Sequence, residues 1–116
     1  MRIGAVMGLL AVALGAFGAH ALKKRLSESD LEVYKTGVLY HLVHAPAVLA
    51  LGIYQQAEAC DAANMAAALL VGGVALFSGS LYALTLSGVR KLGIITPFGG
   101  LAMIAGWLVV AVGVVH

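Results

Sequence analysis

Three histidines lie in or beside long apolar stretches of this 116-residue chain, at spacings that suit metal binding. His41 and His44 are three residues apart and would share a helix face, and His20 from a neighbouring helix would add a third imidazole. Zinc or copper takes such ligands, and two histidines could instead hold haem. No Asp or Glu lies within an apolar stretch to orient the imidazoles. We therefore name His20, His41 and His44 as candidate metal ligands and predict no cofactor.

Further polar residues lie at a similar depth to the histidines. Residues 37, 40, 41, 44 and 48 share one face of a predicted helix, and Ser78 and Tyr82 share a face of the next. Such groups either form hydrogen bonds between helices, each worth about 1 kcal/mol, or line a site for a ligand. The candidate ligand-binding residues are His20, Tyr40, His41, His44, Ser78, Tyr82 and Thr96.

These residues are poorly suited to two functions, proton-coupled transport and nucleophilic catalysis. A proton-coupled transporter usually relies on an intramembrane carboxylate or arginine, so histidine alone would have to carry the proton. Nucleophilic catalysis would need Ser78 or Ser80 in a context such as GxSxG, with a carboxylate to orient the base, and neither is present. We recognise no catalytic constellation and expect a protein that is not an enzyme.

The composition indicates an integral membrane protein. Hydrophobic residues make up 62% of the chain and charged residues 10%, whereas an ordinary soluble domain is about a quarter charged. So few polar residues cannot cover a soluble core of this size, so the apolar excess must face lipid. The single cysteine, Cys60, excludes a disulfide within the chain.

Four apolar stretches are each long enough to cross a hydrocarbon layer about 30 Å thick. Short connections between them make consecutive helices antiparallel neighbours. The sequence therefore predicts one all-α domain, residues 1–116, built as an integral membrane four-helix bundle. Its approximate spans are residues 3–22, 31–55, 62–88 and 94–115.

Local signals refine these spans. Ser29 and Glu32 stand at the spacing of a capping box, which places a helix start near Ser29. Pro46 should bend the second helix, and Pro97 suits the first turn of the fourth. Gly4 and Gly8 form a small-residue pair that favours close helix packing. We expect this pair to pack against another helix of the same four-helix unit.

The basic residues predict the orientation in the membrane. Six of the seven Lys and Arg residues flank the first and third connections, so these connections should be cytoplasmic and both chain ends outside. The same basic residues, at 23–25, oppose cleavage of residues 19–21 as a signal-peptidase site, since they follow the apolar run directly. We expect a multi-pass protein of the bacterial inner, or plasma, membrane.

Four segments carry a resemblance to a known family. They are GAFGAHALKKRL, YKTGVLYHLVHAPAVL, LFSGSLYALTLSG and LGIITPFGGLAMIAGW, and they occur in order in all four spans. Together they resemble the YgdD-like family, domain of unknown function 423, which comprises small bacterial inner-membrane proteins with mitochondrial relatives. The resemblance implies a four-helix membrane protein and no known activity, substrate or cofactor.

Two functions remain open from the sequence. The first is a non-enzymatic structural, interaction or accessory protein, whose basic, histidine-bearing end contacts anionic lipid headgroups, a membrane protein partner or a second copy of the chain. The alternative is a protein that binds or transports a small molecule, lipid or metal through His20, His41 and His44. In both cases the bilayer is the surrounding partner, and so few basic residues beside it argue against nucleic acid.

Overall fold

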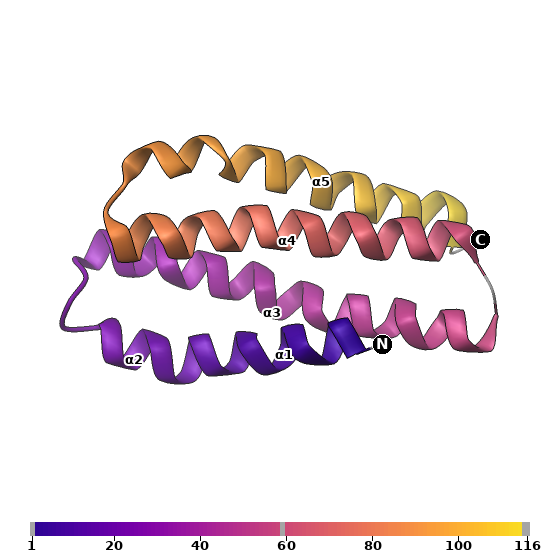
Figure 1. Cartoon of the computed structure of the whole chain (residues 1–116), viewed down its shortest axis with the longest axis horizontal. Coiled ribbons are helices and arrows are strands. Elements are labelled where there is room, and N and C mark those ends of the chain that lie inside the picture. The colour runs from indigo at the N-terminus through magenta and orange to yellow at the C-terminus, as the bar shows by residue number, and fades with distance from the viewer. Residues whose placement is uncertain (1, 59, 115–116) are drawn as a thin grey trace.

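Four long antiparallel helical segments form the computed structural model, which describes residues 2–58 and 60–114 (Figure 1). The first segment joins α1 (Arg2–Ala13) and α2 (Ala19–Leu22) through a π-helical turn, Leu14–Gly18. The next two are α3 (Glu28–Ala57) and α4 (Asp61–Ser87). The last follows a 3₁₀ turn, Arg90–Ile94, and comprises α5 (Thr96–Val109) with a π-helical turn, Val110–Val114. All four segments are long and apolar enough to cross a membrane, which confirms the predicted all-α membrane bundle.

The helix ends differ in detail from the prediction. The N-cap of α3 is Ser27, not Ser29: its backbone is extended and its hydroxyl accepts a hydrogen bond of 3.1 Å from the Asp30 amide. Ser29 lies inside the first helical turn and cannot cap it. Gly88 adopts the left-handed conformation that ends α4, with φ of 75°. The predicted end of the last span at residue 115 lies outside the described residues.

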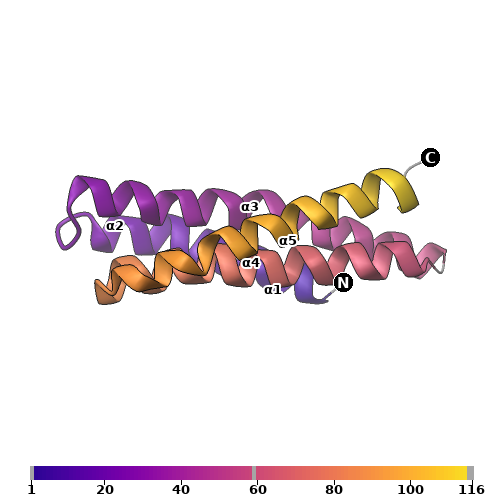
Figure 2. The same ribbon diagram turned by 90° about the horizontal axis from the view of Figure 1, so that it is seen from above.

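The helices pack in a row that follows their order in the chain. The segment containing α1 packs on α3, α3 on α4, and α4 on α5. Figures 1 and 2 show the result, a slab whose Cα extents are 47 × 26 × 17 Å. α1 and α5 are the edge helices, and their large apolar side chains, such as Leu9 and Ile104, are mostly exposed to the surroundings. The central pair α3 and α4 therefore carries most of the buried surface.

Small residues bring the helix backbones together. A Cβ atom at Gly73 would lie 2.8 Å from the Met103 amide nitrogen, so α4 and α5 are in near backbone contact there. Gly4 meets the Leu49 backbone of α3 in the same way, so it packs inside the unit, whereas a Cβ atom at Gly8 would lie 3.9 Å from the Ala45 Cβ, an ordinary contact. The apolar core between the helices is made of Met7, Ala45, Val48, Leu51, Ala63, Ala66, Leu70, Val74 and Met103.

Candidate functional site

The predicted polar residues form separate hydrogen-bonded groups at successive interfaces between helices. The His41 ring lies between α3 and α4, where its Nδ1 is 3.1 Å from the Tyr82 hydroxyl. Beside it, the Ser78 hydroxyl donates a 2.6 Å hydrogen bond to the Gly37 carbonyl. A Cβ atom at Gly37 would lie 3.0 Å from the Tyr82 ring, so the glycine lets this ring pack against the α3 backbone. These contacts fix α3 and α4 in register.

Tyr34 extends this first group to α1. Its hydroxyl donates a 2.7 Å hydrogen bond to the carbonyl of Leu14, in the π-helical turn, and its ring centroid is 5.3 Å from that of Tyr82. A Cβ atom at Gly18 would overlap the Tyr34 hydroxyl, so the glycine makes room for it. Tyr34 is only 1% exposed. It was absent from the predicted residues, although its position three residues before Gly37 and seven before His41 could have indicated it.

His44 belongs to a second group, which faces α5. Its Nδ1 lies 2.7 Å from the Tyr40 carbonyl, and its Nε2 accepts a 2.9 Å hydrogen bond from the Trp107 indole nitrogen. Because the indole N–H can only donate, Nε2 carries no proton and Nδ1 donates to the carbonyl, which gives a neutral imidazole. Both nitrogens are occupied, so His44 is a structural side chain here. Trp107 was also absent from the predicted residues.

Of the remaining candidates, Tyr40 adjoins the second group, with its ring centroid 6.2 Å from that of His44, and Thr96 and His20 belong to neither group. Ser80 and Thr96 share a hydrogen bond between their hydroxyls that joins α4 to the start of α5. Tyr40 packs its ring against Phe77, with centroids 4.5 Å apart, and His20 is exposed on α2. The structure therefore does not bring His20 to the other two histidines. Among residues 2–58 and 60–114, no group of three or more His, Cys, Asp or Glu side chains is arranged to hold a metal ion.

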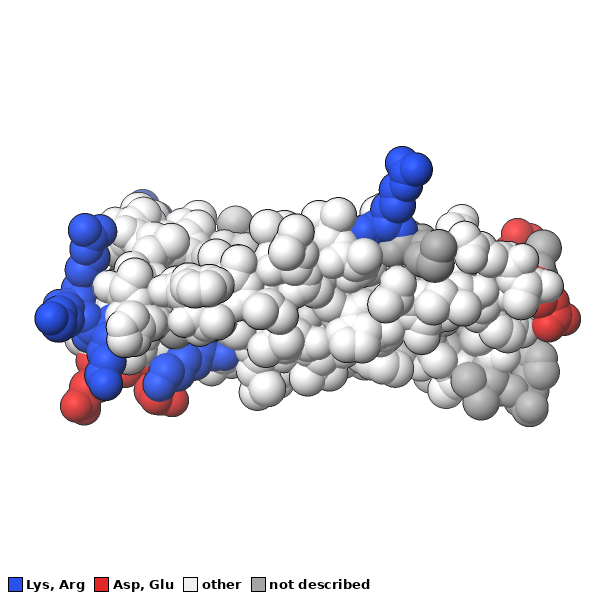
Figure 3. Space-filling view, turned by 90° about the horizontal axis from the view of Figure 1, so that it is seen from below, with Lys and Arg blue, Asp and Glu red and all other residues white. Residues whose placement is uncertain are grey.

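One end of the bundle is strongly basic (Figure 3). Six basic residues and three acidic ones give it a net charge of +3: Lys23, Lys24, Arg25, Lys35, Arg90, Lys91, Glu28, Asp30 and Glu32. Arg90 binds Asp30 in the first turn of α3 through two hydrogen bonds of 2.8 and 3.2 Å. This turn precedes the apolar part of α3, and the hydrogen-bonded guanidinium lowers the pKa of the Asp30 carboxyl below its usual value.

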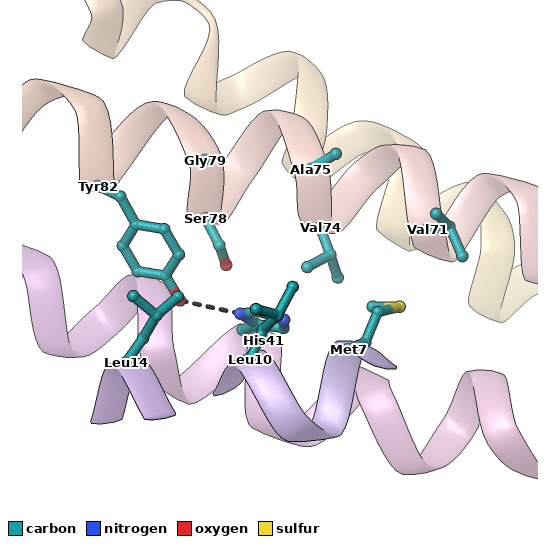
Figure 4. A pocket seen from close by; sticks show the side chains of 10 residues that line it. All are labelled: Met7, Leu10, Leu14, His41, Val71, Val74, Ala75, Ser78, Gly79 and Tyr82. Carbon is teal, nitrogen blue, oxygen red and sulfur yellow. Dashed lines mark hydrogen bonds between the residues drawn. The ribbon is translucent and has the colours of Figure 1, made fainter. Parts of the chain in front are cut away.

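A groove opens beside His41, between α1 and α4 (Figure 4). It has a volume of about 310 Å³, and His41 is the residue of α3 in its lining. Its polar side chains, His41, Ser78 and Tyr82, gather toward one end in Figure 4. Its other lining residues are apolar or small: Met7, Leu10, Leu14, Val71, Val74, Ala75 and Gly79. Of the three predicted histidines, His41 lines this groove.

Comparisons with known proteins identify the family. The model for "Protein of unknown function (DUF423)" matches residues 14–100. The UPF0382 membrane protein YwdK of Bacillus subtilis is 42% identical over 119 residues, which cover 97% of this chain and 93% of YwdK. The UPF0382 inner membrane protein YgdD of Escherichia coli is 39% identical over 112 residues, covering 97% and 86%. No solved structure matches the chain. The chain is a multi-pass membrane protein, and it belongs to the DUF423 family, as its four sequence segments predicted.

Proposed function

We propose that this chain is a non-enzymatic protein of the inner membrane whose basic end faces the cytoplasm and binds anionic lipid headgroups. One observation carries the proposal. Lys23, Lys24 and Arg25 are exposed directly after α2, where the first span ends. Within the described part of the chain, the salt bridges at this end are Arg90 with Asp30 and Lys35 with Glu32, so these three cations are free for an external partner.

The charge at this end suits the inner leaflet. A basic residue close to an anionic membrane surface contributes about 1 kcal/mol to binding, and the attraction decays within a Debye length. Three adjacent cations therefore supply about 3 kcal/mol, roughly a hundredfold preference for anionic over zwitterionic lipid. The opposite end has no comparable cluster, since Arg2 is accompanied there by Glu58 and Asp61.

The polar residues within the spans support a structural rather than a catalytic use. Tyr34, Ser78 and His44 bond to backbone carbonyls or to a neighbouring ring, and these bonds connect the helices. Every Asp and Glu lies at an end of the bundle, so a histidine within the spans has no carboxylate with which to form an acid–base pair. The tightly packed bundle then serves to hold the basic end at the membrane surface.

The test compares two charge-neutralised variants in nanodiscs that contain phosphatidylglycerol and phosphatidylcholine. Replacing residues 23–25 as Lys23→Gln, Lys24→Gln and Arg25→Gln should lower enrichment of phosphatidylglycerol around the protein about a hundredfold, as measured by mass spectrometry of retained lipid. Arg2→Gln, at the opposite end, should leave the enrichment unchanged. Wild-type enrichment should also fall as salt is raised, because these charges are exposed. Equal enrichment in the triple variant and the wild type would refute the proposal.

A further inference from the structure

A cavity at the basic end of the bundle carries charges of both signs. It has a volume of about 380 Å³ and lies between the connection that follows α2 and the first turns of α3. Its lining residues are two cations, two anions and two leucines: Lys23, Lys35, Glu28, Glu32, Leu26 and Leu31. Figure 3 shows basic and acidic side chains next to one another at this end. The charges of the lining therefore balance, whereas the end as a whole has an excess of positive charge.

The spacing of residues on α3 directs four of these side chains to the cavity. Glu28, Leu31, Glu32 and Lys35 follow one another at intervals of three, one and three residues, so they share one face of the helix. Asp30 lies on a different face, where it binds Arg90. The cavity is therefore separate from the ion pair that joins α3 to the third connection.

The charges that line the cavity are available to a ligand. Neither Lys23 nor Glu28 forms a salt bridge with a described residue, although the two line the same cavity. The Lys35 Nζ atom is 3.9 Å from a Glu32 carboxylate oxygen, and these side chains are 55% and 77% exposed. An ion pair with such exposure contributes little to stability, so either partner can bind another charge at small cost. A molecule with both a positive and a negative group would find a partner for each.

The order of the charges along α3 matches that of a phospholipid headgroup. Measured from Gly37, where the apolar part of α3 begins, Lys35 lies about 3 Å, Glu32 about 8 Å and Glu28 about 14 Å along the helix axis. Lys23 directly follows α2, at the end of the first span. The cations are therefore near the hydrocarbon layer and the anions farther out. In a phospholipid the phosphate is attached to the glycerol, and an amine, where present, lies beyond the phosphate.

The chemistry of the lining selects among headgroups. A primary ammonium donates three hydrogen bonds, and carboxylates accept such bonds strongly. A quaternary ammonium such as choline has no N–H and is typically bound by aromatic rings, and none of the described residues that line the cavity is aromatic. A headgroup that carries only negative charge would be repelled by Glu28 and Glu32. The lining therefore suits a zwitterion with a primary amine.

From this arrangement we infer that the cavity binds the headgroup of phosphatidylethanolamine, with the phosphate at Lys23 and Lys35 and the ammonium at Glu28 and Glu32. The inference rests on the proposed placement of the basic end among lipid headgroups, and it adds a zwitterionic lipid to the anionic lipid proposed there. Lys24 and Arg25 lie outside the lining, so both lipids can be bound at once.

The test measures lipid binding to the full chain in detergent micelles by native mass spectrometry, which counts the lipids on each protein molecule. The probes share the same acyl chains and are phosphatidylethanolamine, its N-methyl and N,N-dimethyl derivatives, and phosphatidylcholine. Affinity should fall along this series, because each methyl group removes one N–H donor. Phosphatidylethanolamine should bind about tenfold more tightly than phosphatidylcholine, the effect of one hydrogen bond between charged groups.

Matched variants locate the two ends of the headgroup. The double variant Glu28→Gln and Glu32→Gln should abolish the preference for phosphatidylethanolamine, whereas Glu58→Gln, at the opposite end of the bundle, should preserve it. Lys35→Gln should weaken binding of phosphatidylethanolamine and phosphatidylcholine alike, because both carry the phosphate. Lys91→Gln, exposed at the same end but outside the lining, should weaken neither.

Two further measurements separate this site from other sources of the same signal. Glycerophosphoethanolamine carries the same charges without acyl chains, and it should displace phosphatidylethanolamine only at a much higher concentration than the lipid itself. The double variant Lys24→Gln and Arg25→Gln should lower binding of phosphatidylglycerol but keep the preference for phosphatidylethanolamine over phosphatidylcholine. The two lipid proposals can therefore fail independently.

Several results would overturn the inference. These are equal binding of phosphatidylethanolamine and phosphatidylcholine to the wild type, and a preference that survives replacement of both Glu28 and Glu32. Loss of the preference in Glu58→Gln would place the amine outside the cavity. Displacement by glycerophosphoethanolamine at the concentration of the lipid would identify a water-soluble ligand in place of a lipid.

Discussion

Adjacent glycines on α4 should respond in opposite ways to the same substitution. A Cβ atom at Gly73 would lie 2.6 Å from the Met103 Cγ atom, 2.8 Å from the Met103 nitrogen and 2.9 Å from the Gly99 oxygen. Two of these atoms belong to the backbone of α5, so Gly73→Ala must move one helix away from the other. At Gly72 no atom lies within 4 Å of such a Cβ, and Gly72→Ala meets nothing.

The difference in stability follows from these contacts. Alanine in place of a helical glycine, where space allows, stabilises a protein by about 0.4–1 kcal/mol, which is the result expected for Gly72→Ala. Overpacking a close interface costs about 1–3 kcal/mol. Gly73→Ala should therefore have a free energy of unfolding about 2–3 kcal/mol lower than Gly72→Ala, since the gain in one variant and the loss in the other add.

The assay is reversible unfolding of both variants in mixed micelles with increasing sodium dodecyl sulfate, followed by circular dichroism and tryptophan fluorescence. Trp107 reports on α5 directly, because its indole is bonded to His44 across the interface. If Gly73→Ala proved as stable as Gly72→Ala, the close approach of α4 and α5 at Met103 would be wrong. Gly100→Ala serves as a further control on α5, where the nearest atom, on the Phe77 ring, would be 3.9 Å away.

Three further predictions test other parts of the structure. Trp107→Phe keeps a ring but leaves the His44 Nε2 without its donor, so it should destabilise the fold by about 1–3 kcal/mol in the same unfolding assay, and an unchanged stability would argue against the bond. Because the pKa of Asp30 is lowered in the folded state, its ion pair with Arg90 should stabilise the protein above about pH 4 and lose that effect as the pH falls further; Asp30→Asn should remove this pH dependence of the unfolding midpoint. Alkaline phosphatase fused after His116 should be active and a fusion within residues 23–27 should be inactive, and the reverse pattern would invert the proposed orientation.

The helical architecture was predictable because the hydropathy of a segment indicates whether water or lipid surrounds it. An apolar run of twenty or more residues has few uses other than crossing lipid, and short connections then make neighbours antiparallel. The cap of α3 was harder to assign, because the sequence SESD offers several side-chain oxygens within four residues. Which of them caps the helix depends on where the chain leaves α2, and that is a tertiary property.

The spacing of His41 and His44 did not predict that they would contact different helices. Residues three apart on a helix are separated by about 60° around its axis, close enough to be assigned one face and far enough to meet two neighbours. His41 meets Tyr82 on α4, and His44 meets Trp107 on α5. The second contact joins residues 63 positions apart, and it required knowing that α5 lies within reach of α3.

The hydrogen bond from Tyr34 to the Leu14 carbonyl could not be predicted from the sequence either. It depends on the π-helical turn between α1 and α2, and a local change from α to π geometry leaves little trace in the sequence. The sequence features that could have indicated this turn were Gly15 and Gly18, which interrupt a run of good helix formers. Their role became clear only when Tyr34 was seen to occupy the space that a Cβ at Gly18 would fill.

The row arrangement has a consequence for biogenesis. Each extensive helix interface in the described chain joins spans that are consecutive in the sequence, so packing can follow the order of synthesis. When α3 enters the membrane, α1 is already there to pack against, and α4 then packs on α3 in the same way. No pair of helices that packs early has to separate when a later helix is added. Contacts of this sequential kind favour rapid folding. The indole of Trp107, which reaches back past α4 to His44, would then be among the last groups to arrive and would complete the assembly.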